Sequence, residues 1–247
     1  MWDDTKQLNT FAAAIALVAA AAIGWVALAW VARQPAFEFR EVTVKGTLER
    51  TSLGHVEAVI RDELAGTFFT MNLDRARASL ERIPWVRRVA LRRQWPQRLE
   101  VDVEEHQPLA RWNATGLVNV QGEVFAAEHD GELLLFEGPE GRSAEMATRH
   151  REWSAALAPL ALTVDAVRLS PRGGWQLRAR GAEGALSLEL GRDEPSARLA
   201  RFVAAHGRTL GVLARTGTRI EQVDLRYRNG FAARVPGFRE RAPKKGA

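Results

Sequence analysis

An uncharged apolar run near the start of the chain limits its fold more than any other sequence feature. Residues 11–32 read FAAAIALVAAAAIGWVALAWVA. As a helix, such a run is long enough to cross the hydrocarbon core of a bilayer, which is ~30 Å thick. Trp25 and Trp30 belong to a residue type that is enriched at membrane interfaces. We therefore expect a transmembrane helix over residues 11–32, preceded by a short terminal segment, residues 1–10.

A secretory signal peptide is the alternative interpretation of this run, because Ala27-Leu28-Ala29 resembles a cleavage site. The run is longer than the usual apolar part of a signal peptide, and Asp3 and Asp4 precede it instead of basic residues. Both observations favour a retained anchor. The flanking charges do not decide its orientation, since long domains cross membranes largely regardless of charge.

Composition excludes several classes of site. The 247-residue chain has no cysteine, which removes disulfides, thiolate nucleophiles and cysteine-based metal sites. Its net charge of +5 could indicate nucleic acid or anionic lipid. The basic residues are spread along the chain with acidic residues beside them, so we expect solvated surfaces and no nucleic-acid partner.

Residues 37–106 are predicted to form a small α+β domain. Alternating apolar residues indicate a strand around 39–45, and Thr51 or Ser52 can cap a helix that follows. Asn72 can cap a second helix, which Pro84 ends. Two alternating strands then flank a turn at residues 95–98, so the predicted order is βααββ.

Alternation also predicts which side chains of these two strands share a face. The first strand should bury Trp85, Val89, Leu91 and Trp95 and present Arg88 and Arg92 on its other face. The second strand should present Glu100, Asp102 and Glu104. Arginines beside carboxylates on neighbouring strands favour cross-strand ion pairs.

Residues 107–237 are predicted to be mostly strands, with helices around 146–160 and from Pro195 onward. Near the end, Val223, Leu225 and Tyr227 alternate, and Asn229-Gly230 is a strong signal for a short hairpin turn. Residues 231–235 should return as a last strand. Residues 238–247 form a basic tail that we expect to be disordered.

The motif search finds no catalytic or metal-binding constellation. The histidines are scattered, and no metalloprotease, nucleophile-elbow or phosphate-loop motif occurs. Glu104 and Glu105 are adjacent strand residues, so they point to opposite faces and cannot flank one substrate bond. The sequence predicts a binding module with no enzymatic activity, no metal and no cofactor.

The order of an anchor, a βααββ unit and a β-rich unit resembles the bacterial FtsQ/DivIB family of cell-division proteins. The segments that carry this resemblance are PWVRRVALRRQWPQRLEVDVEEHQPLARW (84–112), LVNVQGEVF (117–125), LLLFEGPEG (133–141), LELGRDEPSARLARF (188–202) and VDLRYRNGFA (223–232).

The resemblance implies a POTRA domain at residues 37–106 and the family's β domain at residues 107–237, a mostly antiparallel sheet with helices on one face. It implies a single-pass type II inner-membrane protein with its bulk in the periplasm, enriched at the division septum. Members connect early cytoplasmic with late periplasmic division proteins by binding FtsB and FtsL. FtsB adds a strand to the edge formed by the last strand.

This resemblance places the expected partner site around that last strand. The expected residues are Arg172, Arg226, Tyr227, Asn229, Gly230, Phe231, Ala232 and Ala233. A purely structural role is the alternative for several of them. Tyr227 could be a core residue, Arg172 an ordinary surface residue and Phe231 a packing residue, and Asn229 and Gly230 could serve only to form the turn. At the level of the whole chain, the alternative is a POTRA module of a protein-transport or outer-membrane assembly system, although no barrel is expected to follow.

Overall fold

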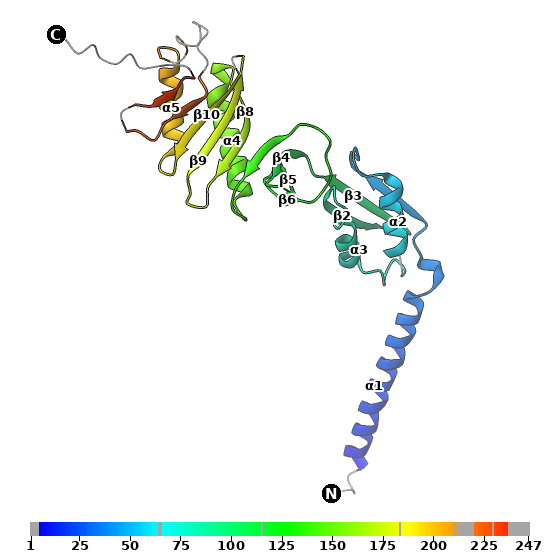
Figure 1. Ribbon diagram of the computed structural model, residues 1–247. Helices are drawn as coiled ribbons and strands as arrows, with labels where there is room; N and C mark the ends of the chain where they lie inside the picture. Colours follow the sequence, from blue (N-terminus) through cyan, green and yellow to red (C-terminus); the bar gives the residue numbers. More distant parts are fainter. Residues whose placement is uncertain are drawn as a thin grey trace, which may run out of the picture. The chain divides into compact units, whose positions relative to one another are not determined.

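The computed structural model describes residues 5–63, 66–114, 116–182, 184–209, 211, 220–228 and 230–236 (Figure 1). The chain divides into two compact units, Met1–His106 and Gln107–Ala247, which we call unit 1 and unit 2. The structure describes residues 5–10 of the expected N-terminal segment, while the expected basic tail at 238–247 lies outside the described residues.

A single long helix, α1 (Thr5–Ala32), opens the chain and confirms the expected apolar helix. Its segment Leu8–Ala32 is long and apolar enough to cross a membrane, and none of it is buried. At ~1.5 Å per residue its 25 residues extend about 37 Å, which exceeds the ~30 Å hydrocarbon core. A signal sequence would meet the same criteria of length and composition.

The rest of unit 1 has the expected βααββ order. Ser52 Oγ accepts a hydrogen bond from His55 N at 3.1 Å, and Asn72 Oδ1 accepts one from Arg75 N at 3.0 Å, so both predicted helix caps are present. The elements are a 3₁₀ turn η1 (Pro35–Phe37), β1 (Glu41–Lys45), α2 (Leu53–Glu63), α3 (Leu73–Leu80), β2 (Val86–Gln94) and β3 (Arg98–Glu105).

Unit 1 has its own sheet and core. β3 lies in the middle of the sheet, parallel to β1 and antiparallel to β2. Apolar side chains of α2, α3 and the three strands form a single cluster, in which Val56, Leu80, Leu99 and Val101 are at most 1% exposed. Long-range pairing of β1 with β3 thus closes the domain around this core.

Two tryptophans of unit 1 lie differently from the sequence expectation. The register of β2 against β3 shifts between Val86 and Arg88, so Val86 is buried and Trp85 is only half-buried. Trp95 is 68% exposed because it follows Gln94, the last residue of β2, where strand alternation no longer applies. Periodicity alone could not reveal either the bulge or the exact strand end.

Ion pairs do link neighbouring strands of this sheet, but mostly through partners other than the expected arginines. The bulge places Arg87 beside Glu104, and β1 brings Lys45 to Glu100, so Arg88 and Arg92 are not the paired residues. The observed pairs are Arg87–Glu104 at 2.7 Å, Lys45–Glu100 at 2.8 Å and Arg98–Glu41 at 2.7 Å.

Unit 2 contains one nine-stranded mixed sheet with the order β12-β11-β10-β9-β8-β7-β4-β5-β6. Five neighbouring pairs are antiparallel and three, β4–β7, β7–β8 and β10–β11, are parallel. The strands are β4 (Pro108–Trp112), β5 (Gly116–Asn119), β6 (Val124–Phe125), β7 (Leu134–Glu137), β8 (Thr163–Leu169), β9 (Trp175–Gly181), β10 (Gly184–Gly191), β11 (Gln222–Asp224) and β12 (Ala232–Arg234).

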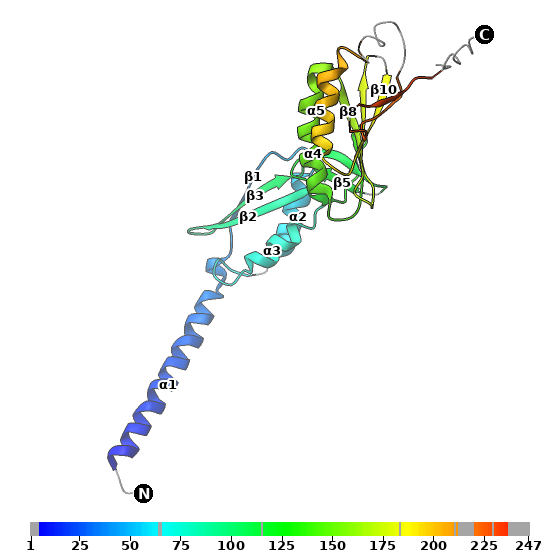
Figure 2. The same cartoon turned by 90° about the vertical axis from the view of Figure 1, so that its left-hand side faces the viewer.

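Two helices, α4 (Ser143–Leu157) and α5 (Pro195–His206), lie side by side on one face of this sheet (Figure 2). A short 3₁₀ turn, η2 (Ala158–Leu160), follows α4. The core of unit 2 lies between the helices and the sheet. Trp153 of α4 is 1% exposed, donates from Nε1 to Ser196 Oγ of α5 at 3.0 Å, and meets Trp175 edge to face at 5.2 Å. The expected α+β fold with helices on one sheet face is confirmed.

Candidate protein-interaction edge

The last strand, β12, forms one edge of the unit 2 sheet. It pairs antiparallel with β11, in the register Gln222↔Arg234, Val223↔Ala233 and Asp224↔Ala232. No strand covers its other side among the residues that the structure describes. All three residues of β12 are exposed, including the expected site residues Ala232 and Ala233. An exposed strand edge carries unpaired backbone donors and acceptors.

The β12 edge is held in place by a long-range pairing. β11 lies parallel to β10, in the register Ser187↔Gln222 and Glu189↔Asp224, and Leu225 N donates to Glu189 O at 2.9 Å. Val223 is fully buried and Leu225 is 2% exposed. The hairpin that carries the open edge is therefore fastened to the core through β11.

The connection between β11 and β12 is longer than the expected Asn-Gly turn. The last register pair is Asp224↔Ala232, so residues 225–231 connect the strands. Asn229 lies outside the described residues. A Cβ added at Gly230 would meet no described atom within 4 Å, so this position has open space around it. The two-residue hairpin prediction is wrong, because the pairing of β11 with β12 ends at Asp224↔Ala232 and leaves a wider loop.

Tyr227 lies in this loop with 58% of its surface exposed. The sequence left it open whether this residue is core or contact, and its exposure excludes the core. Phe231 behaves differently: it is half-buried and its ring meets Phe202 of α5 edge to face at 6.0 Å. Tyr227 is thus available to a partner, whereas Phe231 anchors the loop to the helix layer.

Arg226, in the loop after β11, is held by the carboxylate of Asp224, the last residue of that strand. Its Nε donates to Asp224 Oδ1 at 2.9 Å and its second guanidinium nitrogen to Oδ2 at 2.7 Å, while its backbone N donates to Oδ1 at 2.9 Å. Hydrogen bonds from the Arg226 side chain lower the pKa of Asp224, and the same bonds raise the pKa of Arg226. Both groups stay charged around neutral pH.

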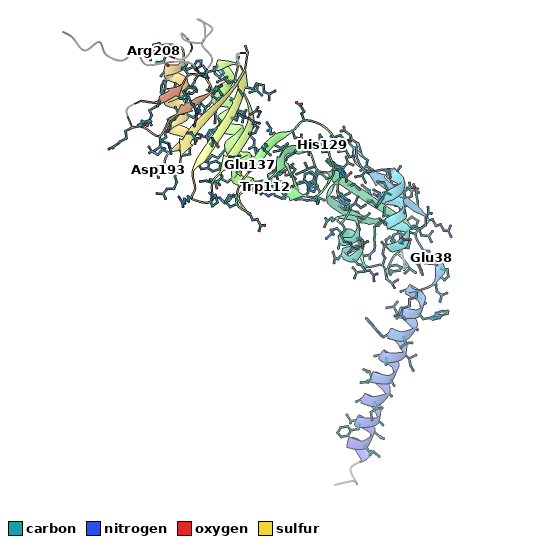
Figure 3. All side chains as sticks on the ribbon, viewed as in Figure 1. Glu38, Trp112, His129, Glu137, Asp193 and Arg208 are labelled. Atoms are coloured by element: carbon teal, nitrogen blue, oxygen red, sulfur yellow. The ribbon has the colours of Figure 1, made fainter. Side chains whose placement is uncertain are left out.

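Arg172 reaches the same end of the sheet from the β8–β9 turn. This turn is closed by Gly173 N donating to Ser170 O at 2.9 Å, and Arg172 is exposed at its tip. A Cβ at Gly173 would lie 3.3 Å from Arg192, so the turn lies directly against the residue after β10. Figure 3 labels the next residue, Asp193, which marks this end of the sheet.

The end of β10 connects this turn to the β11–β12 loop. Gly191, the last residue of β10, has a φ of +73°, and a Cβ there would come within 3.0 Å of the Arg226 side chain. Arg192 thus follows a residue that lies beside Arg226, and its own side chain lies beside the turn that carries Arg172. Arg228 is also exposed in the adjoining loop, and the exposed acidic residues Asp193 and Glu194 follow Arg192.

Sequence reasoning missed Asp224, Arg192 and Arg234 as members of this region. The spacing of Asp224 and Arg226 could have revealed their ion pair, since residues i and i+2 of a strand share a face. Arg192 had no such local signal, because its position depends on the pairing of β9 with β10. Within the described ranges, no group of three or more histidine, aspartate or glutamate side chains is arranged to hold a metal ion.

Two family descriptions match the chain. Residues 110–226 match "Cell division protein FtsQ/DivIB, C-terminal", and residues 37–106 match "POTRA domain, FtsQ-type". The chain belongs to the FtsQ/DivIB family of cell-division proteins. The C-terminal match ends at Arg226, so the β11–β12 loop beyond this residue and β12 itself lie outside it.

Curated relatives agree with this assignment over nearly the whole FtsQ/DivIB chain. The "Cell division protein FtsQ" of Burkholderia pseudomallei is 39% identical over 246 residues, covering 97% of this chain and 96% of the relative. Proteins of the same name from Nitrosospira multiformis and Bordetella pertussis are 38% and 37% identical, covering 95% and 94% of this chain. These descriptions name cell-division proteins and indicate no enzymatic activity.

Proposed function

We propose that this FtsQ/DivIB family member is a non-enzymatic, membrane-anchored adaptor of the cell-division complex. It links early cytoplasmic and late periplasmic division proteins at the septum by binding FtsB and FtsL. The observation that carries the proposal is the open edge of β12 in a chain that belongs to this family. FtsB adds a strand there, next to β12.

The physics of an open edge supports strand addition. The backbone of an added strand pairs its N–H and C=O groups with those of β12, so affinity comes from main-chain hydrogen bonds. Short, exposed Ala232 and Ala233 leave room for an incoming backbone. Side chains beside the edge then supply specificity, and Tyr227 has the exposed, amphipathic character that is enriched in energetically important contacts.

The expected arginines at this end of the sheet favour a partner segment that carries carboxylates. Arg172 and Arg226 lie at this end, and an arginine guanidinium binds carboxylates in a two-pronged geometry. Arg226 already binds Asp224, and this ion pair fixes the position of its guanidinium. A partner carboxylate would bind the same guanidinium beside Asp224. Gly230 and Phe231 belong to the loop in this proposal, with Phe231 acting through its packing on Phe202, and Asn229 is included in the proposed site from the sequence alone.

The proposed topology is single-pass type II in the inner membrane. Helix α1 supplies the anchor, residues before it stay in the cytoplasm, and the POTRA domain (37–106) and β domain (107–237) lie in the periplasm. The length and apolar composition of α1 support the anchor. The alternative of a protein-transport module receives no support, because the relatives matched along nearly their whole length are division proteins.

A titration of the full-length chain in detergent against the periplasmic part of FtsB from the same organism, with FtsL, tests this proposal. The informative variants are Ala232→Pro and Ala233→Pro, since proline removes a backbone donor. Successive N–H groups of a strand point to opposite sides, so one substitution removes a donor facing β11 and the other removes a donor facing the open edge.

The expected result is that one of the two variants keeps the wild-type thermal midpoint and loses FtsB binding. Val124→Pro is the matched control, because Val124 is exposed and lies on β6, the strand at the opposite edge of the sheet. This variant should leave FtsB binding intact. If wild type binds and both folded β12 variants bind equally well, the site lies elsewhere. Failure of wild type to bind FtsB, with or without FtsL, would overturn the adaptor proposal.

A further inference from the structure

Five aromatic side chains gather at one end of unit 1, close in sequence to the end of α1. We call them the aromatic cluster: Phe37, Phe39, Phe68, Phe69 and Trp95. Their rings form a continuous chain of contacts, with centroid separations of 5.2 Å for Phe37–Phe69, 5.3 Å for Phe68–Phe69, 5.8 Å for Phe68–Trp95 and 5.9 Å for Phe39–Phe68.

Three separate segments of the chain build the aromatic cluster, and backbone hydrogen bonds join them. Phe68 N donates to Phe37 O at 2.7 Å, which ties the turn at residues 67–70 to the segment that follows α1. Arg40 N donates to Gln97 O at 2.9 Å, which brings in the β2–β3 turn. The rings are therefore held together by the fold and are not a chance feature of one loop.

The aromatic cluster is open to its surroundings. Phe69 is 52% exposed and Trp95 is 68% exposed, while Phe37, Phe39 and Phe68 are half-buried. Outside α1, the other large apolar side chains described as exposed are Leu53, Val124 and Tyr227, each on a different element. Within the described part of unit 1, the two exposed rings, Phe69 and Trp95, are joined through the half-buried ring of Phe68, which contacts both. Such contiguous apolar surface marks a binding surface for protein or membrane.

The chain itself restricts where this surface can lie. Phe37 follows Ala32, the last residue of α1, by only five residues, which span at most about 18 Å. Thr67 Oγ1 also donates to Ala32 O at 2.5 Å, so the turn that carries Phe68 and Phe69 contacts the helix end directly. The headgroup layer on each side of a bilayer is ~5–8 Å thick, so the cluster is within reach of it.

The residues around the aromatic cluster suit an interface. Trp30 in the last turn of α1 is 65% exposed, and tryptophan is enriched at the level of lipid headgroups. Arg33 and Arg40 are exposed on the connecting segment, where they can meet lipid phosphates, and Glu38 is the exposed acidic residue between them. Figure 3 labels Glu38, which marks the position of the cluster next to α1.

We propose that the aromatic cluster inserts into the headgroup region of the same bilayer that α1 crosses. This inference rests on the proposed membrane anchor and adds a second, peripheral membrane contact made by unit 1. The rings gain free energy at the interface because their apolar surface leaves water, while the indole N–H of Trp95 can stay hydrated. The contact holds the first domain at the membrane surface and restricts its motion on the five-residue connection.

The absence of cysteine from the chain makes a site-specific test direct. Single cysteines are introduced into the full-length protein by Phe69→Cys, Trp95→Cys and Thr47→Cys, and each is labelled with an environment-sensitive fluorophore. Thr47 is the matched control, because it is exposed and follows the far end of β1, whose start adjoins the cluster. The proteins are reconstituted into phosphatidylethanolamine–phosphatidylglycerol vesicles, with and without lipids that carry a nitroxide near the headgroup.

Labels at positions 69 and 95 are expected to emit at shorter wavelength than the label at 47. They should also be quenched by the nitroxide lipids at least about twofold more strongly, because quenching requires lipid contact at interfacial depth. If Phe69→Cys lowers stability, the label at position 95 still tests the proposal, since each label reports lipid contact at its own site.

Flotation of the same vesicles separates failure of this inference from failure of the anchor. If the protein does not float with the vesicles, α1 is no anchor, and the proposed function falls together with this inference. If it floats but positions 69 and 95 match position 47, only the membrane contact of the cluster is overturned. A shift to shorter wavelength without quenching by nitroxide lipids also overturns it, because protein would then cover the rings.

Discussion

Arg226 bends back onto Asp224, the residue two positions before it in the chain, and binds both of its carboxylate oxygens, at 2.9 and 2.7 Å. The ion pair lies at the end of β11, just before the loop that leads to the open edge of the sheet. A charged group that faces the proposed partner is therefore positioned by the chain itself. The pair also makes the stability of this hairpin dependent on the ionisation of Asp224.

The Asp224→Asn substitution should reveal that dependence on pH. The pKa of Asp224 in the folded protein is lowered, so its stabilising contribution is present above the unfolded pKa of about 3.9 and is lost as pH falls through the folded value. We expect the variant to have a lower thermal midpoint than wild type at pH 7 and a smaller deficit at an acidic pH below the unfolded pKa. Asp193→Asn, at an exposed residue 3.5 Å from Arg192, is the control and should change little. An equal loss at both pH values would indicate a steric effect instead.

Replacing Tyr227 by alanine should weaken partner binding without unfolding unit 2. Because the side chain is 58% exposed, we expect the thermal midpoint of residues 34–247 to move by less than about 2 °C. Loss of a central aromatic contact should reduce affinity for FtsB about tenfold, or ~1.4 kcal/mol. Phe231→Ala is the comparison: it removes packing on Phe202 and should lower the midpoint clearly. A Tyr227→Ala protein that melts early would show that the side chain stabilises the fold.

Glu105 should stabilise unit 1 more than its neighbour Glu104 does. Its carboxylate accepts backbone hydrogen bonds from Glu49 at 2.9 Å, Arg50 at 3.2 Å and Thr51 at 2.7 Å, which ties the loop before α2 to the end of β3. Burial acts to raise the pKa of Glu105, but these hydrogen bonds outweigh it and the pKa is lowered. Charged hydrogen bonds contribute ~1.5–3 kcal/mol when shielded, so Glu105→Gln should cost about 1 kcal/mol at this partly exposed site.

Urea unfolding of residues 34–247 at pH 7 measures this difference. Glu104→Gln is the control, because it breaks the ion pair with Arg87 at a Glu104 side chain that is 49% exposed. The control should lose no more than ~0.5 kcal/mol. Equal losses in the two variants would contradict the role assigned to Glu105.

Trp153 should be among the most important side chains for the stability of unit 2. It fills the space between α4, α5 and the sheet at 1% exposure, so Trp153→Ala should cost about 3–5 kcal/mol of unfolding free energy. Ser196→Ala removes the acceptor for its indole N–H, a hydroxyl that also accepts from Arg149 at 3.1 Å, and should cost ~0.5–1.5 kcal/mol. Trp95→Ala, at a 68% exposed residue, should cost less than about 1 kcal/mol in urea unfolding of the soluble part. Similar losses for the two tryptophans would contradict this division between core and surface.

Local sequence patterns predicted well which helices and strands form, but predicted poorly which side chains are buried or meet across strands. The caps at Ser52 and Asn72 were correct because a cap depends on residues within one helical turn. The burial of Trp85 was wrong because a bulge between Val86 and Arg88 reverses the alternation, and a bulge depends on the partner strand. For the candidate site, the exposed strand at Ala232 and Ala233 was anticipated, but the ion pair of Asp224 and the position of Arg192 were not.

The sequence by itself determined the apolar helix, the βααββ order, the strand-rich second half and the family, since each is written in local periodicity or in contiguous motifs. The tertiary structure decided which groups meet. The register of β11 against β12 ends at Asp224↔Ala232, and Tyr227 in the loop that follows is exposed. Hydrogen bonds between segments far apart in sequence also assemble Phe37, Phe68 and Trp95 into one surface. Such contacts depend on strand register and on packing between distant residues, and no local pattern specifies either.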